Sequence, residues 1–249
     1  MSKIKIAISL LTCNDFKYSK DCISSLLESD LFEHEVKLFH WDNNSTDGIN
    51  EFVEQLDIDK EVIVSQDNQG IVIPRIKLFN KIKDQGFDFL LELHADMLFP
   101  KQWFNALLEV DTDNAIILQP GIFLSKNIIS VEDLEKHCTR RRVKKAHNKS
   151  RQVHPWLIKL KKIDEVGGYY LKDYHPQRCE DDDLVWRILS SGRDIVSSEN
   201  SWVMHYAGVT RHKELGGQGS KNHILFQKIN GASIKDLINL TKVHLYEYI

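Results

Sequence analysis

The stretch Phe87-Asp-Phe-Leu-Leu-Glu-Leu-His-Ala-Asp-Met-Leu-Phe-Pro100 decides the fold class of this chain. Its first half is an almost continuous apolar run, which is typical of a strand buried on both faces of a parallel sheet. The run ends at His94-Ala95-Asp96, and Pro100 marks the expected start of the next helix. Open α/β sheets bind ligands beyond the carboxyl ends of their strands, and a carboxylate there suits a divalent cation. The plainer interpretation is a strand-to-helix turn that happens to be polar.

Strands alternate with short helices on both sides of this stretch. We expect further strands at 4–12, 36–41, 61–65, 115–118 and 202–206, and helices at 19–29, 47–56, 74–83, 103–110, 180–189, 221–230 and 233–246. Such alternation favours right-handed βαβ units and a mostly parallel sheet flanked by helices. The sequence therefore predicts an α/β fold.

Four of the predicted strands end in polar residues. These residues are Asn14, Asp42, Asn68 and Asp96. Because parallel strands have their carboxyl ends at the same edge of a sheet, we expect the four side chains to lie in one site.

Composition excludes several classes of protein. A net charge of −3 argues against bulk nucleic-acid binding, and no apolar run approaches the length needed to span a bilayer. The amino terminus lacks a signal-peptide pattern, and the four cysteines show no paired spacing. The default location is therefore the cytoplasm.

Two charged segments lie in the second half of the chain. Residues 137–155 are rich in Lys, Arg and His, and they form either a solvated loop or a clamp for an anionic acceptor or a membrane surface. The run Glu180-Asp181-Asp182-Asp183 opens a helix, where acidic residues favour the helix dipole. Four adjacent carboxylates also repel one another, so they require a cation or an arginine nearby, or a raised pKa in one member.

These motifs together resemble the family 2 glycosyltransferases, which have the GT-A fold. The resemblance covers about residues 3–210 and rests on Asp42-Asn43-Asn44-Ser45-Thr46-Asp47-Gly48, Asn68-Gln69-Gly70, Ala95-Asp96 with Pro100, Gly167-Gly168-Tyr169, Glu180-Asp181-Asp182-Asp183-Leu184 with Arg187, and His205. It implies a single GT-A domain over 1–249. Within it, 1–119 would bind the nucleotide-sugar, 120–210 would form the acceptor side, and 211–249 would supply a lid and C-terminal helices.

The resemblance also implies roles for individual residues. Asp181 would be the catalytic base, and Asp96 with His205 would bind Mn²⁺ or Mg²⁺. The donor site would comprise Thr12, Asn14, Asp42, Asn44, Asn68, Arg75, His94, Ala95 and Asp96. Acceptor or supporting roles would belong to Gly168, Tyr169, Glu180, Asp183 and Arg187, and Arg211 and Lys213 would reach the diphosphate from the lid.

Two positions depart from the family pattern. His94 replaces the first acid of the metal motif, which in the family mainly contacts the ribose or base side of the donor. Ile76 stands where the family often has asparagine. The change at His94 therefore bears on nucleotide recognition more than on the metal.

The resulting hypothesis is a metal-dependent inverting glycosyltransferase that moves a sugar from a nucleoside-diphosphate donor, with UDP favoured. The acceptor would be a hydroxyl of a glycan, a lipid-linked molecule or an anionic polymer. Homo-oligomers and peripheral attachment to the inner face of the membrane are compatible with this hypothesis. The alternatives are a nucleotidyltransferase and a non-catalytic nucleotide- or carbohydrate-binding module on the same fold. The first strand leads into Leu-Leu-Thr-Cys-Asn-Asp rather than the glycine-rich basic loop typical of nucleotidyltransferases.

Overall fold

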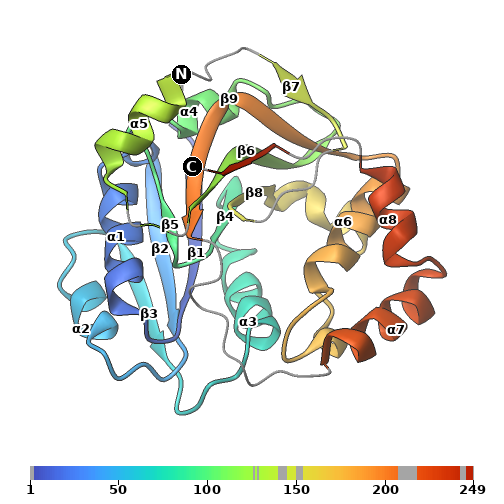
Figure 1. The fold of residues 1–249 in the computed structure, drawn as a ribbon. Coiled ribbons are helices and arrows are strands. Elements are labelled where there is room, and N and C mark those ends of the chain that lie inside the picture. The colour runs from blue at the N-terminus through green and yellow to red at the C-terminus, as the bar shows by residue number, and fades with distance from the viewer. Residues whose placement is uncertain are drawn as a thin grey trace.

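The computed structural model of the protein describes residues 3–125, 127, 129–139, 145–149, 154–206, 218–241 and 245–248. It has an α/β fold in which helices flank a mixed, mostly parallel central sheet, and this confirms the predicted fold class. Figure 1 shows α1 and α2 at the left of the view, α3 between, and α6, α7 and α8 together at the right.

The sheet contains ten described strands. They are β1 (Lys5–Thr12), β2 (Glu35–Asp42), β3 (Lys60–Val64), β4 (Phe89–Leu93), β5 (Met97–Leu98), β6 (Ala115–Ser125), β7 (Ala146–His147), β8 (Trp156–Lys159), β9 (Asp194–Tyr206) and β10 (Tyr246–Tyr248). Their order is β3-β2-β1-β4-β8-β6-β9-β5, with β10 paired to β6 and β7 paired to β9. The first four strands in this order are parallel, so the loops that follow β1, β2, β3 and β4 leave the same edge of the sheet.

The helices pack on both faces of this sheet. They are α1 (Phe16–Leu27), α2 (Ile49–Glu54), α3 (Val72–Ile82), α4 (Phe104–Leu108), α5 (Val131–Thr139), α6 (Glu180–Ser190), α7 (Gln218–Asn230) and α8 (Ile234–Leu240). Short 3₁₀ turns lie at Asp30–Glu33, Leu160–Val166 and Lys172–Tyr174. None of the helices in the described part of the chain is long and apolar enough to cross a bilayer.

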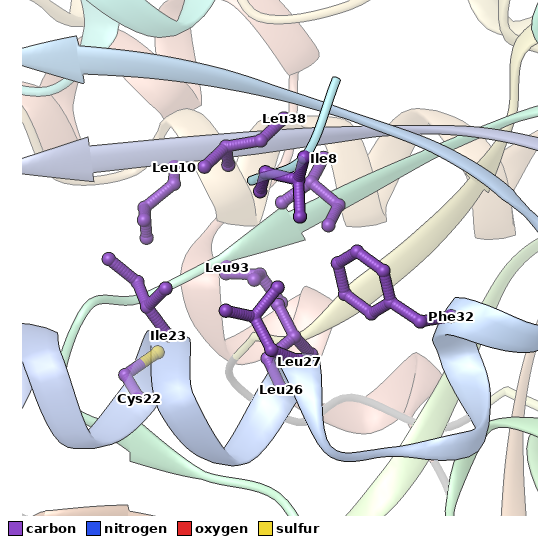
Figure 2. Close-up of a pocket in the computed structure, with 10 residues that line it drawn as sticks. Ile8, Leu10, Cys22, Ile23, Leu26, Leu27, Phe32, Leu38 and Leu93 are labelled. Carbon is purple, nitrogen blue, oxygen red and sulfur yellow. The ribbon is translucent and has the colours of Figure 1, made fainter. Parts of the chain in front are cut away.

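Alternating side chains of β1 explain why both faces are covered. Ile8 and Leu10 belong to the core cluster that includes Ile23 and Leu26 of α1, whereas Ala7 belongs to the cluster on the other face. Figure 2 shows a small gap between α1 and the sheet. Because its lining is apolar, this gap belongs to the core and offers a ligand no polar anchor.

The structure corrects the expected helix start at Pro100. The strand at 87–93 is present as the fully buried β4, but the chain then forms β5, which pairs antiparallel with β9, and α4 begins at Phe104. The carboxylate of Asp30 fixes this start, because Oδ1 accepts from the amides of Trp103 and Phe104 and Oδ2 accepts from that of Asn105. A distant carboxylate therefore caps the helix, and Pro100 does not open it.

We predict that Asp30→Ala lowers the free energy of unfolding by about 2 kcal/mol, because three amides at the start of α4 lose their acceptor. Urea denaturation measures the loss. Asp133→Ala, at an exposed aspartate that pairs only with Lys136 and Ser130 in the described structure, is the control and should leave the urea midpoint almost unchanged. An equal loss in both variants would contradict the capping role.

Other differences lie in the second half of the chain. The strand expected at 202–206 is the end of β9, which begins at Asp194, and the strand expected at 115–118 extends to Ser125. The helix expected over 233–246 ends at Leu240, and β10 follows, parallel to β6. The amide of Ile122 donates to the carbonyl of Leu245 over 2.8 Å, so pairing with β6 decides the conformation of this segment. α5, β7 and β8 were not predicted.

Candidate active site

The loops that follow β1 and β2 are joined by hydrogen bonds. The amide of Asn14 donates to Ser45 Oγ over 2.8 Å, and Asn14 Oδ1 accepts from the amide of Thr46 over 3.0 Å. Asp42 is buried, and its Oδ1 accepts from the amide of Ser45. Thr12 is also buried and lies 2.8 Å from His40 Nε2. The predicted donor residues Thr12, Asn14 and Asp42 therefore belong to one cross-linked edge.

Asn43, which was not among the predicted site residues, connects the loop after β2 to the loop after β3. Its Nδ2 donates to the carbonyl of Gly70, and its Oδ1 accepts from the amide of Gln69 over 3.0 Å. Asn68 and Asn44 are exposed on this edge, and Asn68 Nδ2 lies 3.3 Å from Cys13 Sγ. Hydrogen bonds therefore join the loops after β1, β2 and β3 into one rim.

Arg75 of α3 lies beneath this rim, with 3% of its surface exposed. Its Nη1 donates to the carbonyl and hydroxyl of Ser9 over 2.7 and 3.0 Å, and its Nη2 donates to the carbonyl of Leu93. Its Nε pairs with Glu92 at 3.4 Å. The guanidinium thus links Ser9 of β1 to Leu93, the last residue of β4, and the donor contact predicted for Arg75 stays a prediction.

Three potential metal ligands converge just beyond β4. His94 Nδ1 lies 3.2 Å from His205 Nε2, which lies 3.3 Å from Asp96 Oδ1, and the three ligand atoms all lie within 4.8 Å of one another. Atoms that occupy neighbouring positions around one metal ion are about 3.0–3.4 Å apart, so the two shorter distances suit a shared cation. Pairing of β5 with β9 brings His205 to this point, and Ala95 lies between the two ligands of the β4–β5 turn.

The imidazole of His94 is in the form that a metal requires. Burial lowers its pKa well below the ordinary value, and the neighbouring His154, His205 and Arg75 act in the same direction. A neutral ring keeps a lone pair for coordination. These residues therefore fit a divalent cation.

The acidic start of α6 is balanced in two ways. Arg187 Nε donates to Asp183 Oδ2 over 2.8 Å, and the same guanidinium donates to the carbonyls of Val166, Gly168 and Tyr169. Burial, followed by the charge of Asp181, raises the pKa of Glu180 well above its usual range. Arg187 therefore neutralises one carboxylate, and burial next to Asp181 favours the protonated form of Glu180.

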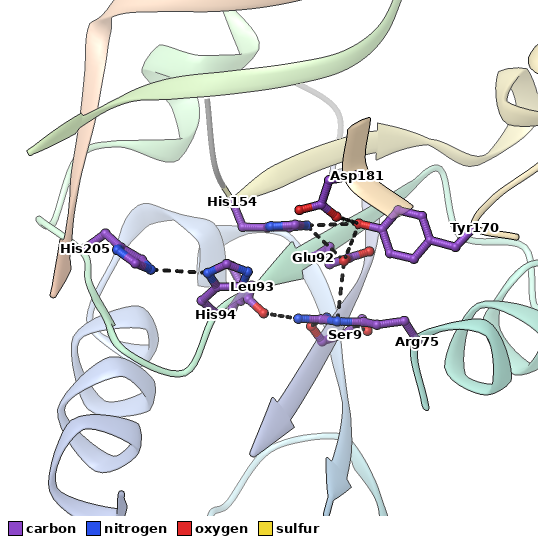
Figure 3. A network of polar contacts seen from close by, with 9 residues as sticks. All are labelled: Ser9, Arg75, Glu92, Leu93, His94, His154, Tyr170, Asp181 and His205. Atoms are coloured by element: carbon purple, nitrogen blue, oxygen red, sulfur yellow. Dashed lines mark hydrogen bonds and ion pairs between the residues drawn. The ribbon is translucent and has the colours of Figure 1, made fainter. Parts of the chain in front are cut away.

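Asp181, the predicted base, is half-buried and contacts a network that the sequence did not reveal. The Tyr170 hydroxyl donates to Asp181 Oδ1 over 2.7 Å. The oxygen of this hydroxyl also lies 3.0 Å from Glu92 Oε1 and 3.3 Å from His154 Nε2. In Figure 3 these side chains lie above Arg75, with the His94–His205 pair to their left. The one available signal was Glu92, since a charged residue inside a buried strand requires partners.

The neighbours of Glu92 and Tyr170 shift the pKa values of these two groups in opposite directions. Burial pushes the pKa of Glu92 upward, but Arg75 and His154 together outweigh it and leave the pKa below its ordinary value. Burial, reinforced by Asp181 and Glu92, raises the pKa of Tyr170 well above its usual range. Tyr170 thus remains a hydrogen-bond donor between two carboxylates.

Comparison with known proteins assigns the family. The model of glycosyl transferase family 2 matches residues 8–157, which is more than half of the chain. The chain belongs to glycosyl transferase family 2. The match contains His94 and Asp96, whereas Asp181 and His205 lie beyond it and reach the site through the fold. No curated protein matches this family 2 chain significantly.

Solved structures share its GT-A fold at low sequence identity. GalNAc-T7 with UDP, GalNAc and Mn²⁺ aligns with a TM-score of 0.72 and 13% identity, over 94% of this chain and 49% of that chain. S. aureus TarS 1–349 with UDP aligns with a TM-score of 0.60 and 17% identity, over 82% of this chain and 60% of that chain. The mannosyltransferase PcManGT from Pyrobaculum calidifontis with GDP-Man and Mn²⁺ aligns with a TM-score of 0.59 and 12% identity, over 84% of this chain and 59% of that chain. The chain thus spans about half to three fifths of the length of these structures.

The remaining predicted residues of this family 2 chain have mixed placements. Gly168 is half-buried, and Tyr169 is buried and stacks on Phe79 with ring centroids 4.6 Å apart. Their acceptor roles stay predictions. Arg211 and Lys213 lie outside the described residues, as does most of the predicted lid. In the described part of 137–155, Lys145 and His147 both pair with Glu199 of β9.

Proposed function

We propose that this protein is a metal-dependent inverting glycosyltransferase that uses a nucleoside-diphosphate sugar, with a UDP-sugar as the favoured donor. The acceptor is a hydroxyl of a glycan, a lipid-linked molecule or an anionic polymer. The observation that carries the proposal is the His94–Asp96–His205 cluster, which lies at the strand edge that also bears Asn14 and Asp42. Membership of family 2 and the UDP complexes of two structural neighbours support it.

Asp96 and His205 would hold Mn²⁺ or Mg²⁺, and His94 Nδ1, which lies 3.2 Å from His205 Nε2, would serve as a third ligand. When bound, the ion stabilises the negative charge that develops on the leaving diphosphate. Two imidazoles and one carboxylate favour Mn²⁺ over Mg²⁺, because nitrogen ligands suit transition metals better. The Mn²⁺ bound to GalNAc-T7 and to PcManGT supports this preference.

Asp181 would take the proton of the acceptor hydroxyl as that oxygen attacks the anomeric carbon. The bond from this carbon to the diphosphate breaks at the same time, so attack from the opposite face inverts the anomeric centre. The rim of loops after β1, β2 and β3 would hold the nucleotide, with Asp42 near the base. Arg187, which pairs with Asp183, and Glu180, whose pKa is raised, would limit the negative charge next to Asp181.

A two-step experiment tests the proposal. Melting temperatures are first measured with a panel of nucleoside diphosphates, with and without Mn²⁺, to identify the nucleotide. A ligand at about 100 times its Kd adds about 2.7 kcal/mol, or about 5–10 °C for a chain of this size. NMR of the product formed from the matching sugar donor then shows whether the anomeric configuration has inverted. Binding without any transfer would favour the non-catalytic module, and retention would overturn the inverting mechanism.

His94→Asp restores the family's usual acid, and we predict that it reduces the preference for Mn²⁺ over Mg²⁺ by on the order of tenfold. An oxygen ligand replaces a nitrogen ligand, so Mg²⁺ gains relative to Mn²⁺. Calorimetry of each metal with the bound nucleotide measures the two affinities. His223→Asp, at an exposed histidine of α7, is the matched control. An unchanged affinity ratio in His94→Asp would exclude His94 as a ligand.

A further inference from the structure

The Tyr170 hydroxyl has one proton and three close neighbours. It lies 2.7 Å from Asp181 Oδ1, 3.0 Å from Glu92 Oε1 and 3.3 Å from His154 Nε2. Two of these neighbours are carboxylate oxygens that only accept when ionised. The single proton must therefore go to one of them.

The contacts of Glu92 decide which carboxylate receives it. His154 Nε2 lies 2.9 Å from Glu92 Oε1, and Arg75 Nε lies 3.4 Å from the same oxygen. His154 Nδ1 is buried without a hydrogen-bond partner in the described structure. Because a buried N–H without an acceptor is costly, a neutral ring would carry its proton on Nε2, which faces Glu92. Glu92 Oε1 is thus already paired with His154 and Arg75, and the shorter contact of Tyr170 goes to Asp181.

The tyrosine ring is held rigidly for this contact. Tyr170 has 6% of its surface exposed and stacks on Tyr169 with centroids 4.2 Å apart, and Tyr169 stacks in turn on Phe79. The hydroxyl is therefore fixed before any substrate binds. On Asp181 it occupies Oδ1, while Oδ2 makes no hydrogen bond to any described residue.

We propose that Tyr170 is a positioning residue for the catalytic base, because its hydroxyl holds Oδ1 of Asp181 and leaves Oδ2 to face the acceptor. This inference rests on the proposed function and adds to it the residue that orients the base. In the transfer step, the acceptor O–H bond breaks and its proton moves to Oδ2 of Asp181. The acceptor oxygen bonds to the anomeric carbon, and the diphosphate leaves with the electrons of the broken bond. The hydrogen bond from Tyr170 keeps the carboxylate in the orientation that this step requires.

Tyr170→Phe tests the inference, and Tyr174→Phe is a closely matched control. Tyr174 is buried as well, and its hydroxyl donates to Asp183 Oδ1. Asp183 lies on α6, as Asp181 does, and Arg187 and Asn230 also bind its carboxylate. Both variants lose one tyrosine hydroxyl bonded to one α6 carboxylate. Only Tyr170→Phe removes a contact of the base.

The first readout requires no substrate. The carboxyl resonance of Asp181 is followed against pH in protein labelled with ¹³C-aspartate, and Asp181→Asn assigns the signal. The titratable and charged groups around this carboxyl are Glu180 and Asp182 on its own helix and Tyr170, which donates to it. Glu92 and His154 contact the Tyr170 hydroxyl, and Arg75 pairs with Glu92. We expect the midpoint to rise by about one pH unit in Tyr170→Phe, because the ionised form loses a donor, and to stay constant in Tyr174→Phe.

The second readout is steady-state transfer. In Tyr170→Phe we expect kcat to fall by about 10–100-fold with an unchanged KM for the donor, because the base is misoriented but the donor rim is intact. Tyr174→Phe should keep kcat within about threefold. An unchanged midpoint in Tyr170→Phe, or an equal loss of kcat in both variants, would overturn the positioning role. Lack of transfer by the wild-type protein, with the midpoint shifted as expected, would instead count against the proposed function.

Discussion

Asp96→Ala is expected to abolish the stabilisation of the protein by Mn²⁺ and nucleotide, and to lower kcat/KM by on the order of 10³-fold or more. Asp96 supplies the one carboxylate of the metal cluster, and its Oδ1 lies 3.3 Å from His205 Nε2. Without it, two imidazoles and no carboxylate remain to hold a divalent ion beside a negatively charged diphosphate. A metal that acts as a Lewis acid contributes several kcal/mol to the transition state, which corresponds to this loss in rate.

Thermal shifts measure the binding part of this prediction. The wild-type protein should gain about 5–10 °C with Mn²⁺ and the matching nucleotide at about 100 times Kd, whereas Asp96→Ala should gain under about 1 °C. Asp113→Ala, at an exposed aspartate before β6, is the control and should behave as the wild type. A full Mn²⁺-dependent shift in Asp96→Ala would show that the ion binds elsewhere.

The sequence predicted the elements whose pattern is local. The apolar run at Phe87–Leu93 predicted β4, and the polar residues after it predicted that Asp96 and Asn14 lie at one edge of the sheet. The start of α4 could not be predicted in this way. Its cap, Asp30, lies more than seventy residues away in the chain, and no local pattern links the two.

The same reason explains what was missed in the site. Glu92 was predicted as a buried strand residue, but its partners Arg75, His154 and Tyr170 come from three other segments. The donor role that the family resemblance implies for His94 stays a prediction. The 3.2 Å contact between its Nδ1 and His205 Nε2, across 111 positions of the chain, could not be predicted from the sequence. Single residues with a chemical role could be selected from sequence, but their pairing depends on how β9 and the 154–170 segment meet β4.

Asp181→Asn is expected to lower kcat by on the order of 10³-fold while leaving the Mn²⁺-dependent binding of the donor nucleotide intact. An amide cannot accept the proton of the acceptor hydroxyl, and general base catalysis contributes about 10²–10⁴-fold. The amide is nearly isosteric with the carboxyl, and Asp181 is not part of the His94–Asp96–His205 cluster, so the metal site should be unaffected.

The neighbouring residue makes this test specific. Asp182→Asn removes one carboxylate from the same helical turn. The hydrogen bond from Tyr170 goes to Asp181, so this variant leaves the proposed base and its contact in place. If the transfer depends on a base at 181, Asp182→Asn should keep kcat within about tenfold of the wild type. If the loss arose only from a changed field at the start of α6, both variants would lose activity alike. A large loss in Asp182→Asn alone would transfer the role of base to Asp182, and the hydrogen bond from Tyr170 to Asp181 would then be structural.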